Sequence, residues 1–313
     1  MIEVENLSKR YGDKIAVDGL SFTVQPGIVT GFLGPNGAGK STTMRMIAGL
    51  DRPTTGRAMV NGHDYRSAIA PMAELGVLLE ARAVHTGRSA RNHLRALAQT
   101  NGVSRRRVEQ VIDLVGLQQV AGKRVGGFSL GMGQRLGVAS ALLGNPQTMV
   151  LDEPVNGLDP EGVLWIRTML KSLAAQGHTV FVSSHLMSEM ALTATRLVVV
   201  GRGRLIADTS VAEFVARASG HTVTVRTPEA ARLRNVLIQS DNNDITVNRI
   251  PDQPDVLHVK GVTAQHIGTT AWHAHIPIYE LATREASLEE AFMALTQDSV
   301  EYRSTEDTAA VAA

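Results

Sequence analysis

Short apolar runs that end at Gly-rich or polar segments recur along the first two thirds of the chain. Residues 28–33 form one such run, and 148–151 and 179–182 form two others. Unbroken apolar runs of this length are typical of strands buried on both faces of a sheet. Apolar spacing after 42 and after 135 instead predicts helices. The pattern therefore predicts an α/β domain over residues 1–215.

Two segments depart from this alternation. Residues 1 to about 30 alternate strand-like runs with turns, and 81 to about 135 has the spacing of a helical insert. No Asp or Glu occurs between 81 and 107, where the charged residues are Arg82, Arg88, Arg91, Arg95, Arg105, Arg106 and Arg107. These arginines form either a solvated face or a docking surface for a partner or anionic lipid heads.

The pattern of apolar and polar residues changes after about residue 220. The apolar pattern predicts strands and helices in the order β-α-β-β-α-β, at 222–227, 228–237, 245–250, 255–260, 263–274 and 276–281. This order predicts a small α+β accessory domain over 216–297. Ser287 and Glu290 have the spacing of a capping box that opens a last helix. We expect the polar tail, 298–313, to be disordered.

Composition narrows the class of protein. The 313 residues carry a net charge of +1 and no cysteine. A near-neutral chain lacks a global basic field for nucleic acid, and without cysteine there are no disulfides or thiolate metal sites. No apolar run approaches the roughly 18 residues of a membrane span, and the N-terminus lacks the blocks of a signal peptide. We expect a soluble protein, for which a partner would supply any membrane-spanning part.

The run at 28–33 leads into a phosphate-binding loop. Eight residues fit the pattern G-x-x-x-x-G-K-[ST], namely Gly34, Pro35, Asn36, Gly37, Ala38, Gly39, Lys40 and Ser41. Glycines let backbone N–H groups cradle phosphate oxygens at a helix N-terminus, where the dipole favours negative charge. Lys40 can reach the β- and γ-phosphates, and Ser41 offers a hydroxyl to Mg²⁺. The loop predicts binding of a nucleoside triphosphate.

Polar residues end the other two runs. Asp152 and Glu153 follow the run at 148–151, and His185 follows the run at 179–182. Open parallel sheets bind ligands at the carboxyl ends of their strands. Asp152 is thus placed to hold Mg²⁺ and Glu153 to polarise an attacking water. His185 is a further catalytic candidate, although a lone histidine is more often structural.

Two other candidates have ordinary alternatives. Ser129 lies where a second Gly-rich loop, 125–134, meets a helix. Such a position is either an anion site or a serine N-cap without a ligand. Tyr11 stands in a polar turn and is either a platform for a nucleobase or, more simply from its position, a surface aromatic.

Together and in this order, the motifs over residues 1 to about 215 resemble the ATP-binding subunits of ABC transporters. The resemblance implies a mixed sheet with flanking helices, an N-terminal antiparallel β subdomain, and ATP with Mg²⁺ as ligands. The residues that match the family's motifs are Tyr11 (adenine stacking), Gly34 to Ser41 with Thr42 (Walker A), Ser129 and Gly131 (signature), Asp152 and Glu153 (Walker B), Asp159 (D-loop) and His185 (switch histidine).

Two positions depart from the family's pattern. The signature normally reads Leu-Ser-Gly-Gly-Gln, whereas residues 128–132 read Phe-Ser-Leu-Gly-Met, which keeps Ser129 and Gly131. Glu80 stands where the family has glutamine, and a carboxylate cannot donate an amide hydrogen bond but adds a charge near Mg²⁺. Both changes resemble the drug- and antibiotic-export branch, which often carries an α+β extension ending in Ser-Leu-Glu-Glu-Ala-Phe.

The resemblance also implies partners. Two copies would pair head to tail, with ATP between Walker A of one copy and the signature of the other. The dimer would drive a separate multi-span permease at the cytoplasmic face of the membrane, docked at the insert, which favours docking for some of its arginines. The expected function is export of drugs, antibiotics or other amphipathic compounds.

The alternative function is a soluble ABC-type ATPase acting on ribosomes or DNA. Such proteins usually have two ATPase cores or a long coiled-coil insert, and this sequence has one phosphate loop and no such insert. We also expect no nucleic-acid partner, because no basic patch is large enough. A small regulatory GTPase is excluded because the chain lacks an Asn-Lys-x-Asp motif.

Overall fold

The computed structural model describes residues 1–80, 84–218, 222–240, 245–250, 253–284 and 287–296. Contacts divide the chain into two units, the larger containing Met1–Val211 and the smaller Ala212–Leu295. The expected tail, 298–313, and Arg82 lie outside the described residues. The domain limits given above, 215 and 297, stay predictions.

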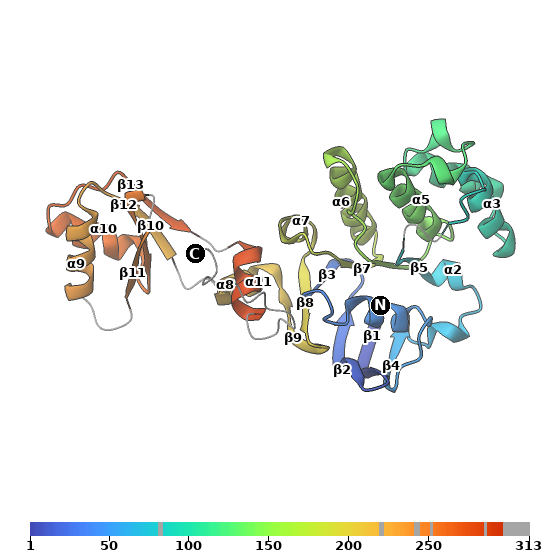
Figure 1. Cartoon of the computed structure of the whole chain (residues 1–313), viewed down its shortest axis with the longest axis horizontal. Helices are drawn as coiled ribbons and strands as arrows, with labels where there is room; N and C mark the ends of the chain where they lie inside the picture. Colours follow the sequence, from blue (N-terminus) through green and yellow to red (C-terminus); the bar gives the residue numbers. More distant parts are fainter. Residues whose placement is uncertain (81–83, 219–221, 241–244, 251–252, 285–286, 297–313) are drawn as a thin grey trace, which may run out of the picture. The chain divides into compact units, whose positions relative to one another are not determined.

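A six-stranded sheet forms the centre of the larger unit (Figure 1). Its order is β5 (Leu75–Leu78), β6 (Thr148–Leu151), β7 (Thr179–Ser183), β3 (Val29–Leu33), β8 (Arg196–Gly201) and β9 (Arg204–Ser210). All neighbours are parallel except β8 and β9, which form an antiparallel hairpin. The central strands β3, β6 and β7 are buried along their whole length, which explains their unbroken apolar sequences.

A three-stranded antiparallel sheet packs on one face of this sheet. Its order is β2 (Lys14–Val24), β1 (Ile2–Tyr11) and β4 (Thr55–Val60). Phe22 of β2 lies against Phe32 and Phe181 of the large sheet, with ring centroids 5.8 and 5.6 Å away. Figure 1 shows this small sheet on one side of the large one, and α3, α5 and α6 on the other. This confirms the expected mixed sheet with an antiparallel β subdomain.

The helices of the larger unit include the expected insert. Their bounds are α1 (Lys40–Ile47), α2 (Pro71–Glu74), α3 (Ala90–Thr100), α4 (Arg105–Leu114), α5 (Leu130–Leu142), α6 (Pro160–Ala175) and α7 (Met187–Thr193), with short 3-10 turns at 65–67, 118–120 and 125–127. Among the described residues, none of the helices is both long and apolar enough to cross a membrane.

Three arginines of the insert have partners within the larger unit. Arg91 and Arg95 lie 3.0 and 3.2 Å from the carboxylate of Glu109. Arg107 donates to the backbone oxygen of Leu142 across 2.8 Å, and burial lowers the pKa of its guanidinium. These three therefore stabilise the contacts of α4 with α3 and α5. Among the described arginines of the insert, Arg88, Arg95, Arg105, Arg106 and Arg124 are exposed.

The smaller unit is a split β-α-β arrangement. Its elements are α8 (Val211–Ala218), β10 (Thr222–Arg226), α9 (Ala230–Ser240), β11 (Thr246–Ile250), β12 (Gln253–Lys260), α10 (Ala264–His273), β13 (Glu280–Arg284) and α11 (Leu288–Thr296). The antiparallel sheet has the order β11-β12-β10-β13. Ser287 and Glu290 exchange two hydrogen bonds, so the predicted capping box is confirmed.

The last strand of this unit lies further along the chain than the sequence pattern predicted. The predicted span, 276–281, has the wrong bounds, because β13 is Glu280–Arg284. Ile276 is buried and its N–H donates to the Ala271 oxygen, which holds it to the end of α10. Apolar residues at this point therefore belong to the core under the helix rather than to the strand.

Candidate functional site

The phosphate loop is held closely between β3 and α1. Gly37 and Gly39 have φ values of 82° and 97°, in the left-handed region that favours glycine. A Cβ at Gly39 would overlap the backbone oxygen of Ala16, and one at Gly34 would come within 2.5 Å of the Val200 oxygen. The loop therefore needs glycine at these positions for reasons of packing as well as dihedral angle.

Lys40 is the charged residue of the loop, and 8% of its surface is exposed. Its Nζ donates to the backbone oxygens of Gly34 and Pro35 across 2.7 and 3.2 Å. Burial lowers the pKa of this ammonium, and the charges of Glu153 and Asp152 oppose that effect. The structure thus brings the loop lysine within electrostatic reach of both carboxylates.

Asp152 and Glu153 lie at the carboxyl end of β6, beside the end of β7. The Ser183 hydroxyl donates to Asp152 Oδ1, and its oxygen accepts the Glu153 backbone N–H across 3.0 Å. Sequence reasoning did not single out Ser183 as a site residue. The available signal was a polar residue that ends an apolar run, but its partners become clear only from the pairing of β6 with β7.

Glu153 and His185 are in direct contact. His185 Nδ1 lies 2.7 Å from Glu153 Oε2, and the His185 backbone N–H donates to the same oxygen across 3.2 Å. The glutamate side chain is 23% exposed and the histidine 54%. Gln134 also donates to the Glu153 backbone oxygen, across 3.1 Å. Glu153 itself has φ of 51°, an unusual value for a residue with a side chain.

Ser129 and Gly131 belong to a second, outward-facing group. Ser129 is exposed and is the N-cap of α5, because its hydroxyl accepts the Met132 N–H across 3.2 Å. A Cβ at Gly131 would lie 2.9 Å from the Gly157 oxygen, so the signature contacts the D-loop of the same chain. The N-cap interpretation is therefore confirmed, and it leaves the ligand role of Ser129 as a prediction.

The remaining candidates occupy simpler positions. Asp159 is the N-cap of α6, with Oδ1 accepting the Gly162 N–H across 2.9 Å. Tyr11 ends β1 and is 48% exposed, and its hydroxyl donates to Asp51 across 3.1 Å. Burial and this hydrogen bond raise the pKa of Tyr11. Glu80 is exposed two residues after β5 ends.

A pocket borders the signature on the side of the insert. Its volume is about 290 Å³, and it is lined by Val84, Thr86, Val125, Gly126, Phe128, Ser129, Leu130 and Gly133. Within the described residues, no group of three or more His, Cys, Asp or Glu side chains could hold a metal ion. The roles assigned to the individual site residues stay predictions.

Comparison with known proteins places both units in described families. The family described as ABC transporter matches residues 17–156, and a domain of unknown function matches 221–289. The bacitracin transport ATP-binding protein BcrA of Bacillus licheniformis is 39% identical over 209 residues, covering 66% of this chain and 68% of the relative. The linearmycin resistance ATP-binding protein LnrL of Bacillus subtilis is 32% identical, covering 95% and 98%.

A solved structure has the same fold. The ATP-binding subunit of an ABC transporter is 26% identical, has a TM-score of 0.64, and is matched over 69% of this chain and 92% of its own. With the phosphate loop, the two carboxylates and the histidine assembled at one sheet edge, the chain belongs to the family of ABC transporter ATP-binding subunits and is an ATPase of that family.

Proposed function

We propose that this chain powers a separate multi-span permease that exports antibiotics, drugs or other amphipathic compounds. The observation that carries the ATPase part is the group of Lys40, Asp152, Glu153 and His185 at the carboxyl ends of parallel strands. The export part is supported by the transport and resistance functions named for the relatives described above. The proposed location is the cytoplasmic face of the membrane.

In the proposed reaction, Glu153 orients the attacking water and accepts its proton. Its Oε2 is held by both the side chain and the backbone of His185, which leaves Oε1 for the water. Lys40 and the loop N–H groups stabilise the charge on the transferring phosphoryl group. The exposed edge of His185 would contact the γ-phosphate.

The donor set fits a magnesium ion. Mg²⁺ prefers hard oxygen ligands and keeps several waters, and the candidates are the exposed hydroxyl of Ser41 and the carboxylate of Asp152, with Glu80 as a further acid. Ser183 donates to Asp152 and so fixes the direction of that carboxylate. When bound, the ion would neutralise charge on the β- and γ-phosphates.

The proposed assembly is a homodimer with ATP at its interface. Ser129 and Leu130 are exposed, Leu130 by 47%, although both belong to the motif expected to meet the nucleotide. An exposed signature and an enclosed phosphate loop in the same chain support a site completed by a second copy, in which Tyr11 stacks on adenine and Asp159 faces the interface. The permease would dock at the insert, through the pocket beside Phe128 and the exposed arginines.

The Glu153→Gln variant tests the ATPase assignment. It should bind ATP, hydrolyse it about a hundredfold more slowly, and dimerise in ATP, because the amide cannot accept the water's proton. Phosphate release and size-exclusion chromatography measure both properties. Glu161→Gln, at an exposed acid of the α6 first turn, is the matched control. A monomeric Glu153→Gln protein that hydrolyses at the original rate would show that the assignment is wrong.

Purification from cells tests the partner. We expect the tagged chain to co-purify from solubilised membranes with a polytopic membrane protein, and Arg105→Glu combined with Arg106→Glu to weaken that association. Arg204→Glu, an exposed arginine on β9 that pairs with Asp18, is the control. Recovery with ribosomes or DNA, and without a membrane protein, would support the soluble alternative instead.

A further inference from the structure

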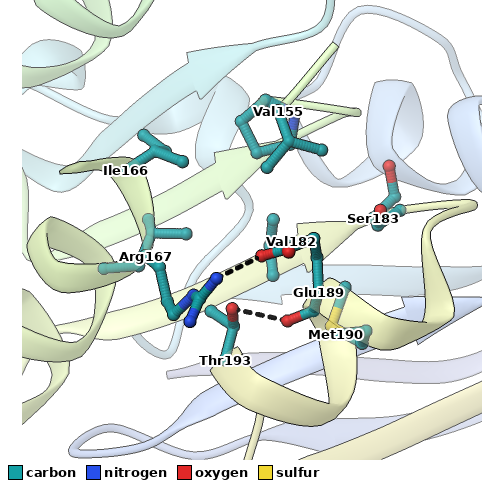
Figure 2. A pocket seen from close by; sticks show the side chains of 11 residues that line it. Val155, Ile166, Arg167, Val182, Ser183, Glu189, Met190 and Thr193 are labelled. Carbon is teal, nitrogen blue, oxygen red and sulfur yellow. Dashed lines mark hydrogen bonds and ion pairs between the residues drawn. The ribbon is translucent and has the colours of Figure 1, made fainter. Parts of the chain in front are cut away.

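An ion pair joins α6 and α7, the helices that follow the D-loop and the switch histidine. Arg167 Nη2 donates to Glu189 Oε2 across 2.8 Å, and the two side chains are 23% and 24% exposed. Figure 2 shows this contact, together with the hydrogen bond from Thr193 Oγ1 to the Glu189 backbone oxygen. Because α6 begins directly after Asp159 and α7 begins two residues after His185, the pair links the two segments.

A small cavity lies beside the ion pair (Figure 2). Its volume of about 20 Å³ has room for roughly one water molecule. Its wall includes the residues just after Glu153 and just before His185, namely Pro154, Val155, Ser183 and Ser184. The backbone next to each catalytic candidate therefore borders a small void. Their spacing must be fixed by other contacts.

Helix α7 is short and depends on tertiary contacts for its position. It has seven residues and its N-cap, Leu186, provides no side-chain cap. A helix of this length is unstable by itself and depends on tertiary contacts. One such contact is the buried Met190, which packs against Gly31 of β3, where a Cβ would come within 2.5 Å of the sulfur. Another is the hydrogen bond that Arg167 donates to Glu189.

The geometry of Arg167 favours a positional role over a stabilising one. Its Nε is buried without a hydrogen-bond partner, a costly arrangement that offsets much of what the ion pair contributes to stability. The paired charges instead define one separation between α6 and α7. The side chain of His185, just before α7, reaches Glu153 across 2.7 Å and so depends on that separation.

We propose that Arg167 and Glu189 are positioning residues for ATP hydrolysis, which hold α7 against α6 and thereby keep His185 on Glu153. This inference rests on the catalytic roles proposed above for those two residues. Neither Arg167 nor Glu189 touches the nucleotide in this scheme. The pair therefore affects kcat and leaves ATP binding unchanged.

The first experiment separates kcat from binding. Arg167→Met and Glu189→Gln should each lower kcat about tenfold, since small misplacements of catalytic groups are costly, while the Kd for ATP stays within about twofold. The exchanged pair, Arg167→Glu with Glu189→Arg, should recover part of the rate. Arg196→Met, which breaks an ion pair with Asp208 of similar length (2.7 Å) on the β8–β9 hairpin, should leave kcat unchanged. Thermal unfolding verifies that all variants are folded.

The second experiment asks whether the pair acts through the histidine. In a His185→Ala background, Arg167→Met should cause no further loss, because the group that it positions is gone. Multiplied losses would overturn the proposal, as would an unchanged kcat in Arg167→Met beside a slow His185→Ala protein. If His185→Ala itself hydrolyses ATP at the original rate, the proposed role of His185 fails, and the positioning proposal fails with it.

Discussion

The two Gly-rich loops of the ATPase unit have opposite surroundings. The phosphate loop follows a fully buried strand, its lysine is 8% exposed, and its glycines face the backbone of β2 and β8. The signature loop is exposed at Ser129 and Leu130, and it contacts its own helix, the D-loop and the backbone of Thr86 and Arg88. The phosphate loop is packed into the core, whereas the signature loop is partly exposed to solvent.

Similar glycine content therefore serves different purposes. In the phosphate loop, glycine allows positive φ angles at Gly37 and Gly39 and close packing at Gly34 and Gly39, so contacts within one chain fix the conformation of this loop. In the signature, Gly131 allows a close contact with the Gly157 oxygen of the D-loop, whereas Gly133 faces open space. The first loop should be sensitive to changes in folding and in nucleotide binding, and the second to changes in assembly.

The largest effect is expected at the phosphate loop. Lys40→Met removes the buried charge opposite Asp152 and Glu153, so we expect ATP binding to weaken and hydrolysis to fall about a thousandfold. Fluorescent-nucleotide titration and phosphate release measure these effects. Lys171→Met, at an exposed position of α6, is the control and should be neutral. Normal hydrolysis in Lys40→Met would contradict the assignment of the loop.

A smaller effect, of a different kind, is expected at the signature. Ser129→Arg should lower hydrolysis about a hundredfold while each copy still binds ATP, because in the proposed dimer the serine would act on the nucleotide of the partner copy. Ser104→Arg removes another serine N-cap, that of α4, and controls for the lost cap. Mixing Ser129→Arg with Lys40→Met should restore some activity, since one intact composite site can then form. No recovery in the mixture would count against the head-to-tail arrangement.

Glycine substitutions in the two loops should change the unfolding free energy in opposite directions. Gly39→Ala places a methyl group at φ 97° against the Ala16 oxygen and should cost about 3 kcal/mol of unfolding free energy. Gly133→Ala, in α5, meets open space and should stabilise the unit by about 0.5–1 kcal/mol. Denaturant unfolding followed by Trp165 fluorescence, in a Trp272→Phe background, reports on this unit. Equal effects at both positions would contradict the distinction.

The smallest effect concerns pH. His93 of α3 is buried against Ser140 of α5, and burial followed by the charge of Arg88 lowers its pKa. The unfolded chain therefore takes up this proton first, and the unfolding free energy should fall as pH drops below about 6.5. His93→Gln should flatten that slope, whereas His273→Gln, at an exposed position of α10, should not. An unchanged slope in His93→Gln would exclude this source of acid sensitivity.

The local sequence pattern was sufficient to predict the strands that are completely buried. Strands β3, β6 and β7 were predicted because apolar residues fill both of their faces, and the phosphate loop because its spacing is fixed by one ligand. The last strand of the smaller unit was misplaced because Ile276 packs at a helix end, which looks the same in sequence as a strand residue.

Contacts between segments that are distant in the sequence could not be predicted from local pattern. Glu109 neutralises Arg91 and Arg95 from a different helix, outside the segment whose charge pattern had suggested an unpaired basic surface. Ser183 gains its role from the order of β6 and β7 in the sheet. Arg167 and Glu189 meet because α6 and α7 pack together, and neither residue belongs to a recognisable motif.

The left-handed backbone of Glu153 has a consequence for any attempt to improve this protein in the laboratory. At φ of 51° a glutamate is strained, while glycine or asparagine would adopt the same angle at lower cost. Selection of variants for heat resistance alone would therefore enrich replacements at this position. The selected variants would be more stable and would still bind nucleotide, but they would no longer hydrolyse ATP. Engineering of this ATPase should screen for hydrolysis from the first round.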